Sequence, residues 1–126
     1  MIQPARAAVI WEGDSLDVLR EWPRDIQRDF GLCLLNIQKG ERPTLSARPM
    51  QSIGQGVFEL KTADEAAWYR VIYLARISDR IYVLDSFIKK SRKTEKRDLN
   101  RAKARLSKLK QRLQEERTYA KHKSTQ

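Results

Sequence analysis

The sequence predicts an α+β domain in which two N-terminal helices pack on a small antiparallel sheet of about four strands, with a further C-terminal helix. Three observations predict it: two apolar helical patterns before residue 40, three closely spaced strand-like runs over residues 57–88, and a narrow apolar seam after residue 95. A chain of 126 residues suffices for one core and is too short for two. We therefore expect a single domain over residues 1–117, which includes the last helix, and a flexible basic tail over residues 118–126.

The N-terminal part reads as a strand followed by two helices. A short strand covers residues 7–11, and Asp14 or Ser15 can cap the helix after it. Pro23 separates this helix from a second one, because proline is tolerated in a first helical turn and not in the middle of a helix. The second helix ends near Gly40 and has an apolar stripe at spacings of three and four. The stripe consists of Ile26, Phe30, Cys33, Leu34 and Ile37. We expect the two helices to cover one face of the sheet.

The middle of the chain reads as a loop followed by a meander. Residues 41–56 are expected to be a loop, because prolines and glycines interrupt any regular pattern. Residues 57–61, 68–74 and 81–88 are rich in β-branched, aromatic and aliphatic side chains, as strands are. The links between them are too short for a crossover helix, so neighbouring strands should be antiparallel.

The last helix should run from about Glu95 to Arg117, with Thr94 as a possible cap. Its apolar residues form one seam on an otherwise charged helix. The seam consists of Leu99, Ala102, Leu106, Leu109 and Leu113. Such a seam fits a helix docked on the domain, and it also fits a surface for a partner helix.

The charge distribution divides the chain at residue 89. Residues 1–88 hold 11 Lys or Arg and 12 Asp or Glu, whereas residues 89–126 hold 15 and 4, so that nearly all of the net charge of +10 follows the third strand of the meander. A basic segment on a neutral body indicates a polyanionic partner, with nucleic acid first and an anionic membrane surface second. A basic tail that merely confers solubility is the alternative.

Several kinds of chemistry are poorly supported. Cys33 is the single cysteine and His122 the single histidine, which gives neither a zinc-binding set nor a catalytic triad. No Walker-type glycine loop is present, and we expect no cofactor and no metal. Without an apolar stretch of membrane-spanning length or a signal peptide, the expected location is cytoplasmic and away from membranes. What remains is a set of cations on or beside the sheet: Lys61, Arg70, Lys89, Lys90, Arg92 and Lys93.

Three segments together resemble the HigB branch of the RelE/ParE superfamily of type II toxins, a branch that includes phage-derived toxin-like proteins. They are GQGVFELK at residues 54–61, YRVIY at residues 69–73 and IYVLDSFIKKSRKT at residues 81–94. The resemblance implies a compact RelE-like fold and a metal-independent endoribonuclease that cleaves messenger RNA in the ribosomal A site, with contacts to ribosomal RNA. It also implies a helix-turn-helix antitoxin that binds the toxin in a hetero-oligomer.

The resemblance also assigns roles to individual residues. Arg70 matches the family's strand arginine, which contacts the scissile phosphate, and Lys89, Lys90 and Lys93 match its basic loop. Asp85 stands where many relatives have histidine, so that it is either a proton-transfer group or an ion-pair partner of Arg70 or Lys61. We expect further contacts to RNA from Arg48, Lys61, Arg76, Arg92 and Phe87.

Two other functions fit the same residues. One is a ParE-like inhibitor of DNA gyrase, which binds its target and is not an enzyme. The other is a non-catalytic nucleic-acid-binding or phage regulatory protein that is held by salt-sensitive contacts from the basic tail.

Overall fold

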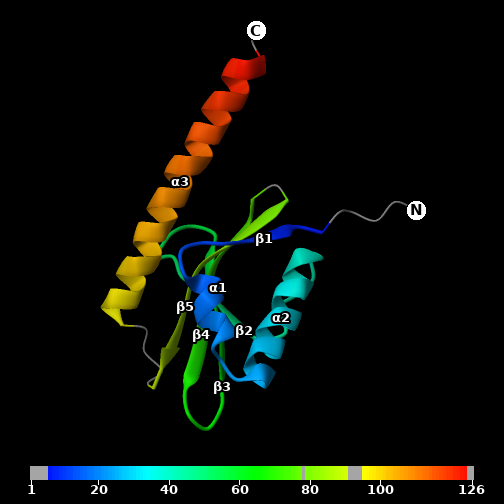
Figure 1. The fold of residues 1–126 in the computed structure, drawn as a ribbon, viewed down its shortest axis with the longest axis vertical. Coiled ribbons are helices and arrows are strands. Elements are labelled where there is room, and N and C mark those ends of the chain that lie inside the picture. The colour runs from blue at the N-terminus through cyan, green and yellow to red at the C-terminus, as the bar shows by residue number, and fades with distance from the viewer. Residues whose placement is uncertain (1–5, 78, 91–94, 125–126) are drawn as a thin grey trace, which may run out of the picture.

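The structure is a computed structural model that describes residues 6–77, 79–90 and 95–124, except for the side chains of Arg76 and Ser124. It confirms the α+β fold: a central sheet has α1 and α2 on one side and α3 on the other (Figure 1). The elements are β1 (Ala8–Trp11), α1 (Ser15–Arg20), α2 (Arg24–Gln38), β2 (Ser46–Pro49), β3 (Val57–Ala63), β4 (Trp68–Ile77), β5 (Arg80–Lys89) and α3 (Lys96–Ser124).

The sheet has five strands in the order β1-β5-β4-β3-β2, and it is mixed where an antiparallel sheet of about four was expected. The meander β3-β4-β5 is antiparallel as predicted, but β1 pairs with β5 in parallel. β2 lies within the segment expected to be a loop and adds an antiparallel edge strand to β3. All four residues of β2 are exposed and one is Pro49, so this strand lacks the apolar pattern by which strands are recognised.

One face of the sheet packs on α1 and α2. Tyr69, Val71 and Tyr73 of β4 point to this side, because alternate residues of a strand project from opposite faces. The expected helix stripe is confirmed, since Ile26, Phe30, Cys33 and Leu34 are all buried. Trp22 is also buried, with its ring centroid 5.4 Å from that of Phe30 and 5.2 Å from that of Tyr69.

The other face, which we call the α3 face, packs on the first half of α3. Ala102, Leu106 and Leu109 are buried against Ile72 and Leu74 of β4 and Leu84 of β5, and Leu99 and Leu113 pack at the edges of this cluster. The seam of α3 is therefore docked on its own domain. The helix continues to Ser124, beyond the expected end near Arg117, and its described side chains from Gln114 onward are exposed. Figure 1 shows this last part extending past the sheet.

Two expected helix features differ in detail. Asp14 is the N-cap of α1, but its carboxylate makes no capping hydrogen bond and instead binds Arg105 of α3. The Ser15 hydroxyl donates a hydrogen bond of 3.3 Å to the carbonyl oxygen of Val83. Both contacts tie α1 to distant parts of the fold. No helix in the described ranges combines the length and apolar character that crossing a bilayer requires.

Candidate functional site

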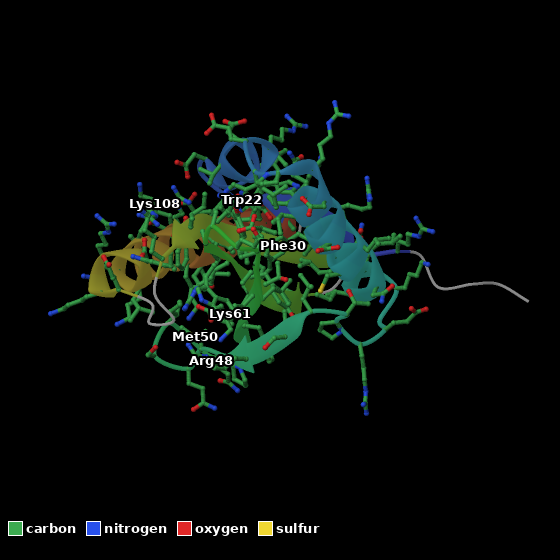
Figure 2. All side chains as sticks on the ribbon, turned by 90° about the horizontal axis from the view of Figure 1, so that it is seen from below. Trp22, Phe30, Arg48, Met50, Lys61 and Lys108 are labelled. Atoms are coloured by element: carbon green, nitrogen blue, oxygen red, sulfur yellow. The ribbon has the colours of Figure 1, made fainter. Side chains whose placement is uncertain are left out.

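Strand register brings most of the predicted site residues to the α3 face. Lys61 of β3 is paired with Arg70 of β4, and Arg70 is paired with Phe87 of β5. Arg48 of β2 is paired with Glu59 of β3. Directly opposed residues project from the same face of a sheet, and so do residues two apart in one strand, so these side chains form two neighbouring rows on one face. Figure 2 shows Arg48 and Lys61 on the opposite side of the sheet from Trp22 and Phe30.

A β-bulge in β5 brings the other predicted site residues of that strand, Asp85 and Lys89, to this face. The β4–β5 register shifts between Ile72 and Tyr73, which are paired with Asp85 and Val83, so Leu84 is the additional residue. Without the bulge, strict alternation would point Asp85 toward α1 and α2. With it, Asp85, Phe87 and Lys89 all point toward α3.

Arg70 and Glu59 lie in neighbouring rows and form a buried ion pair. The Nη1 atom of Arg70 is 3.3 Å from Oε2 of Glu59, and the two side chains are 0% and 1% exposed. Arg48 approaches the same carboxylate from the surface, with Nη2 at 3.5 Å from Oε1 and a side chain that is 57% exposed. A carboxylate thus lies between a buried guanidinium and an exposed one. Arg70 has no direct access to solvent in this conformation, and Arg48 is the exposed cation of the cluster.

Lys61 lies beside this cluster and is partly exposed. Its Nζ atom is 5.3 Å from the ring centroid of Trp68, which is also partly exposed. This is a cation–π contact, which holds the ammonium group near the surface without neutralising its charge. Lys61 therefore remains a cation that a phosphate can approach.

The two described lysines of the basic loop differ in environment. Lys89 is only 5% exposed, and its Nζ atom lies 2.6 Å from Oδ2 of Asp98 and 3.1 Å from Oε2 of Glu95. Its charge is therefore compensated by two carboxylates of the segment that begins α3. Lys90 is exposed. Arg92 and Lys93 lie outside the described residues, as does the side chain of Arg76.

Asp85 is bound by α3 rather than by Arg70 or Lys61. Its carboxylate accepts hydrogen bonds from Nε of Arg101 at 2.8 Å and from Nη1 of Arg105 at 3.0 Å, and a third from its neighbour's backbone N–H. Burial raises the pKa of Asp85, and the two guanidinium groups act against that rise. Arg101 also binds Asp98 at 2.7 Å and packs on Phe87, with 5.9 Å from Cζ to the ring centroid. Asp85 therefore anchors α3 to β5.

Glu59 is the residue of this site that was not singled out from the sequence. The only signal was its position: a carboxylate in the apolar run Val57–Leu60, on the same side of the strand as Lys61. A charged residue in such a run needs a buried partner or an exposed face, and the sequence alone does not show which. The partner is Arg70, which lies 11 residues further along the chain.

The arrangement combines a proton acceptor with phosphate-binding cations. The carboxylate of Glu59 can accept a proton, and Arg48 and Lys61 can bind non-bridging phosphate oxygens. No group of three or more His, Cys, Asp or Glu side chains suited to a metal ion occurs within the described part of the chain.

Comparison with known proteins gives one family. The model of the family described as "Phage derived protein Gp49-like (DUF891)" matches residues 17–107, a range that begins within α1, includes α2 to β5 and ends within the docked part of α3. No curated protein and no solved structure matches the chain.

Proposed function

The chain belongs to the phage-derived Gp49-like family, a RelE/HigB-like family associated with the toxins of toxin–antitoxin systems, and from this premise we propose that it is a toxin that cleaves messenger RNA. Membership of a toxin family implies an antitoxin partner. The observation that carries the proposal is the cluster of Arg48, Glu59 and Arg70 beside Lys61, because it holds a base and phosphate-binding cations together.

The proposed reaction is a transesterification within RNA. Glu59 takes the proton of a ribose 2′-OH, the 2′ oxygen forms a bond to the adjacent phosphorus, and the bond from phosphorus to the 5′ oxygen breaks. The products are a 2′,3′-cyclic phosphate and a 5′-OH, whose proton comes from Lys61 or from water. Arg48 and Lys61 stabilise the negative charge that develops on the phosphoryl oxygens, an effect worth about 3–4 kcal/mol for each well-placed donor.

Arg70 has a different role in this scheme from the direct phosphate contact expected of it. Because its guanidinium is fully buried against Glu59, it acts as a positioning residue that orients the carboxylate. An incoming phosphate meets the exposed Arg48 first and competes with Glu59 for it. Withdrawal of Arg48 toward the phosphate leaves the carboxylate with Arg70 as its ion-pair partner and opens one of its oxygens to the 2′-OH.

The resemblance to the HigB branch adds the setting, namely messenger RNA in the ribosomal A site, and a helix-turn-helix protein as the antitoxin. The ribosomal setting and the antitoxin can each be tested separately from the cleavage mechanism. Purified protein should cut a transcript on translating ribosomes and leave the same transcript intact without them, and co-expression of the antitoxin should restore growth.

The chemistry is tested by brief induction in cells and primer extension on cellular transcripts. New 5′ ends that accept labelled phosphate from polynucleotide kinase without prior phosphatase treatment identify a 5′-OH product. Glu59→Gln should reduce cleavage by about 10²–10⁴, as expected for loss of a general base. Lys61→Gln tests the cation beside Glu59 and should also lose activity. Its matched control is Lys39→Gln, which changes an exposed lysine at the end of α2 and should keep activity.

Intact transcripts in growth-arrested cells would contradict the proposal. If those cells also accumulated double-strand DNA breaks, inhibition of gyrase would replace it. Growth arrest that needs neither RNA cleavage nor DNA damage would favour a non-catalytic binding protein.

A further inference from the structure

Helix α3 carries a regular row of cations that the candidate cleavage site does not use. Lys96, Lys103, Lys110 and Arg117 are seven residues apart and all exposed. Seven residues are almost two helical turns, with a drift of only about 20°, so these side chains lie along one side of the helix. The row is about 32 Å long at a rise of about 1.5 Å per residue.

The cations of this row differ from the arginines on the opposite side of the same helix. Arg101, Arg105 and Arg112 are bound by carboxylates of the body of the domain: Asp85, Asp14 and Glu12. Among the described residues, no ion pair involves Lys96, Lys103, Lys110 or Arg117. The docked seam thus lies between bound arginines on one side of the helix and uncompensated cations on the other.

The residues around the row exclude two kinds of partner. Those on its solvent side are small or amidic: Asn100, Ser107, Gln111, Gln114 and Thr118. Binding to a membrane surface requires exposed large apolar side chains beside the cations, whereas Leu99, Leu106 and Leu113, which lie next to the row, pack on the sheet. Single-stranded nucleic acid is held mainly by stacking on aromatic rings, and Tyr119 lies on the arginine side.

A straight row of long cationic side chains that has no aromatic neighbour, and whose apolar neighbours pack on the sheet, fits the phosphates along a duplex. Such contacts fix position on the nucleic acid without reading its sequence. From this geometry we propose that the row formed by Lys96, Lys103, Lys110 and Arg117, here called the α3 row, binds the phosphate backbone of double-stranded RNA. The second half of the row lies beyond the part of the chain that the Gp49-like family covers, residues 17–107.

RNA is the favoured duplex because of where the row begins. Lys96 is the first residue of α3 and lies between Glu95 and Asp98, which both bind Lys89 of the candidate site. An RNA duplex on the α3 row would therefore lead a neighbouring single-stranded segment toward Arg48 and Lys61. This step rests on the proposed RNA cleavage, whereas the duplex binding itself does not.

The test is binding of the full chain to a 20-base-pair RNA duplex in which every ribose is 2′-O-methylated, so that cleavage cannot occur. Fluorescence anisotropy would give Kd over a range of salt concentrations. The test variant is Lys103→Gln/Lys110→Gln/Arg117→Gln. The matched control is Arg28→Gln/Lys108→Gln/Lys123→Gln, which removes the same charge from exposed positions off the row.

The test variant should bind the duplex about tenfold or more weakly, and the slope of log Kd against log salt should fall by about two to three, one for each lost phosphate contact. In the control variant the slope should fall by less than half as much as in the test variant. Equal losses in both variants would overturn the proposal, because net charge alone would explain them. Wild-type protein that binds a single-stranded RNA of the same length, or anionic vesicles, more tightly than the duplex would also overturn it.

Loss of the proposed cleavage and loss of duplex binding are distinguishable. Glu59→Gln should bind the methylated duplex as wild type does while failing to cleave transcripts. If the protein never cleaves RNA but its duplex binding depends on the α3 row, the surface stands and the proposed function does not.

Discussion

The Arg70 guanidinium and the Glu59 carboxylate lie 3.3 Å apart, Nη1 to Oε2, on adjacent strands, and neither has appreciable exposure to solvent. A buried ion pair loses much of its Coulombic gain to the desolvation of both charges. Such a pair is weak evidence for stability. The pair lies beside the exposed Arg48 and the partly exposed Lys61, which is where the proposed cleavage needs a carboxylate.

The first prediction concerns that pair. Arg70→Met or Glu59→Met alone should lower the free energy of unfolding by about 3–5 kcal/mol, because each leaves one buried charge without this partner. The double variant Glu59→Met/Arg70→Met should be at least as stable as the better of the two single variants, since both charges are gone. Urea unfolding of the four proteins measures the coupling. Additive losses would show that the two residues do not act as a pair.

Apolar periodicity was sufficient to predict the fold class, the stripe of α2 and the three strands of the meander, because periodicity reports burial directly. It was insufficient for β2, whose four residues are all exposed. The parallel pairing of β1 with β5 joins segments about 70 residues apart. Such a pairing depends on the packing of the intervening helices and leaves no local pattern.

The sequence predicted which residues form the site more fully than it predicted the contacts between them. Arg48, Lys61 and Arg70 were expected to contact RNA, and strand register brings them to one face. The bulge at Leu84 could not be foreseen, and it turns Asp85 toward α3. That is why Asp85 binds two arginines of the last helix, where pairing with Arg70 or Lys61 had been considered.

The second prediction concerns the attachment of α3. Asp85→Asn should weaken the hydrogen bonds from Arg101 and Arg105 and lower the protection of the amides of residues 99–109 by about 2–3 kcal/mol. Amides of β4 should keep their protection unless the whole domain is destabilised. Native-state hydrogen exchange separates these cases. Asp29→Asn, at an exposed position of α2, is the control and should leave the exchange of α3 unchanged.

The third prediction contrasts two glycines. A Cβ atom at Gly54 would lie 2.6 Å from Cδ2 of Leu106, so Gly54→Ala should destabilise the protein by about 1–3 kcal/mol through overpacking against α3. A Cβ atom at Gly31, at an exposed position of α2, would meet nothing within 4 Å. Gly31→Ala should therefore stabilise the protein by about 0.5–1 kcal/mol through its higher helix propensity. Thermal unfolding of both variants measures the change in stability, which should be a loss for Gly54→Ala and a gain for Gly31→Ala. A change of the same sign in both variants would contradict this packing.

The last prediction concerns alkaline pH and Tyr73. Burial raises the pKa of its phenol to about 12, from an ordinary value of 10.0. The unfolded chain releases this proton at a lower pH than the folded protein, so the contribution of Tyr73 to stability is complete below pH 10 and declines as the pH rises toward 12. Tyr73→Phe keeps the ring that stacks on Phe58 at 5.7 Å and removes the proton. Its urea midpoint should therefore fall less than that of wild type between these pH values. The control is Tyr119→Phe, at a tyrosine that is 67% exposed, and its urea midpoint should fall with pH as that of wild type does. If the urea midpoint of Tyr73→Phe fell as steeply as that of wild type, another group would be responsible for the alkaline loss of stability.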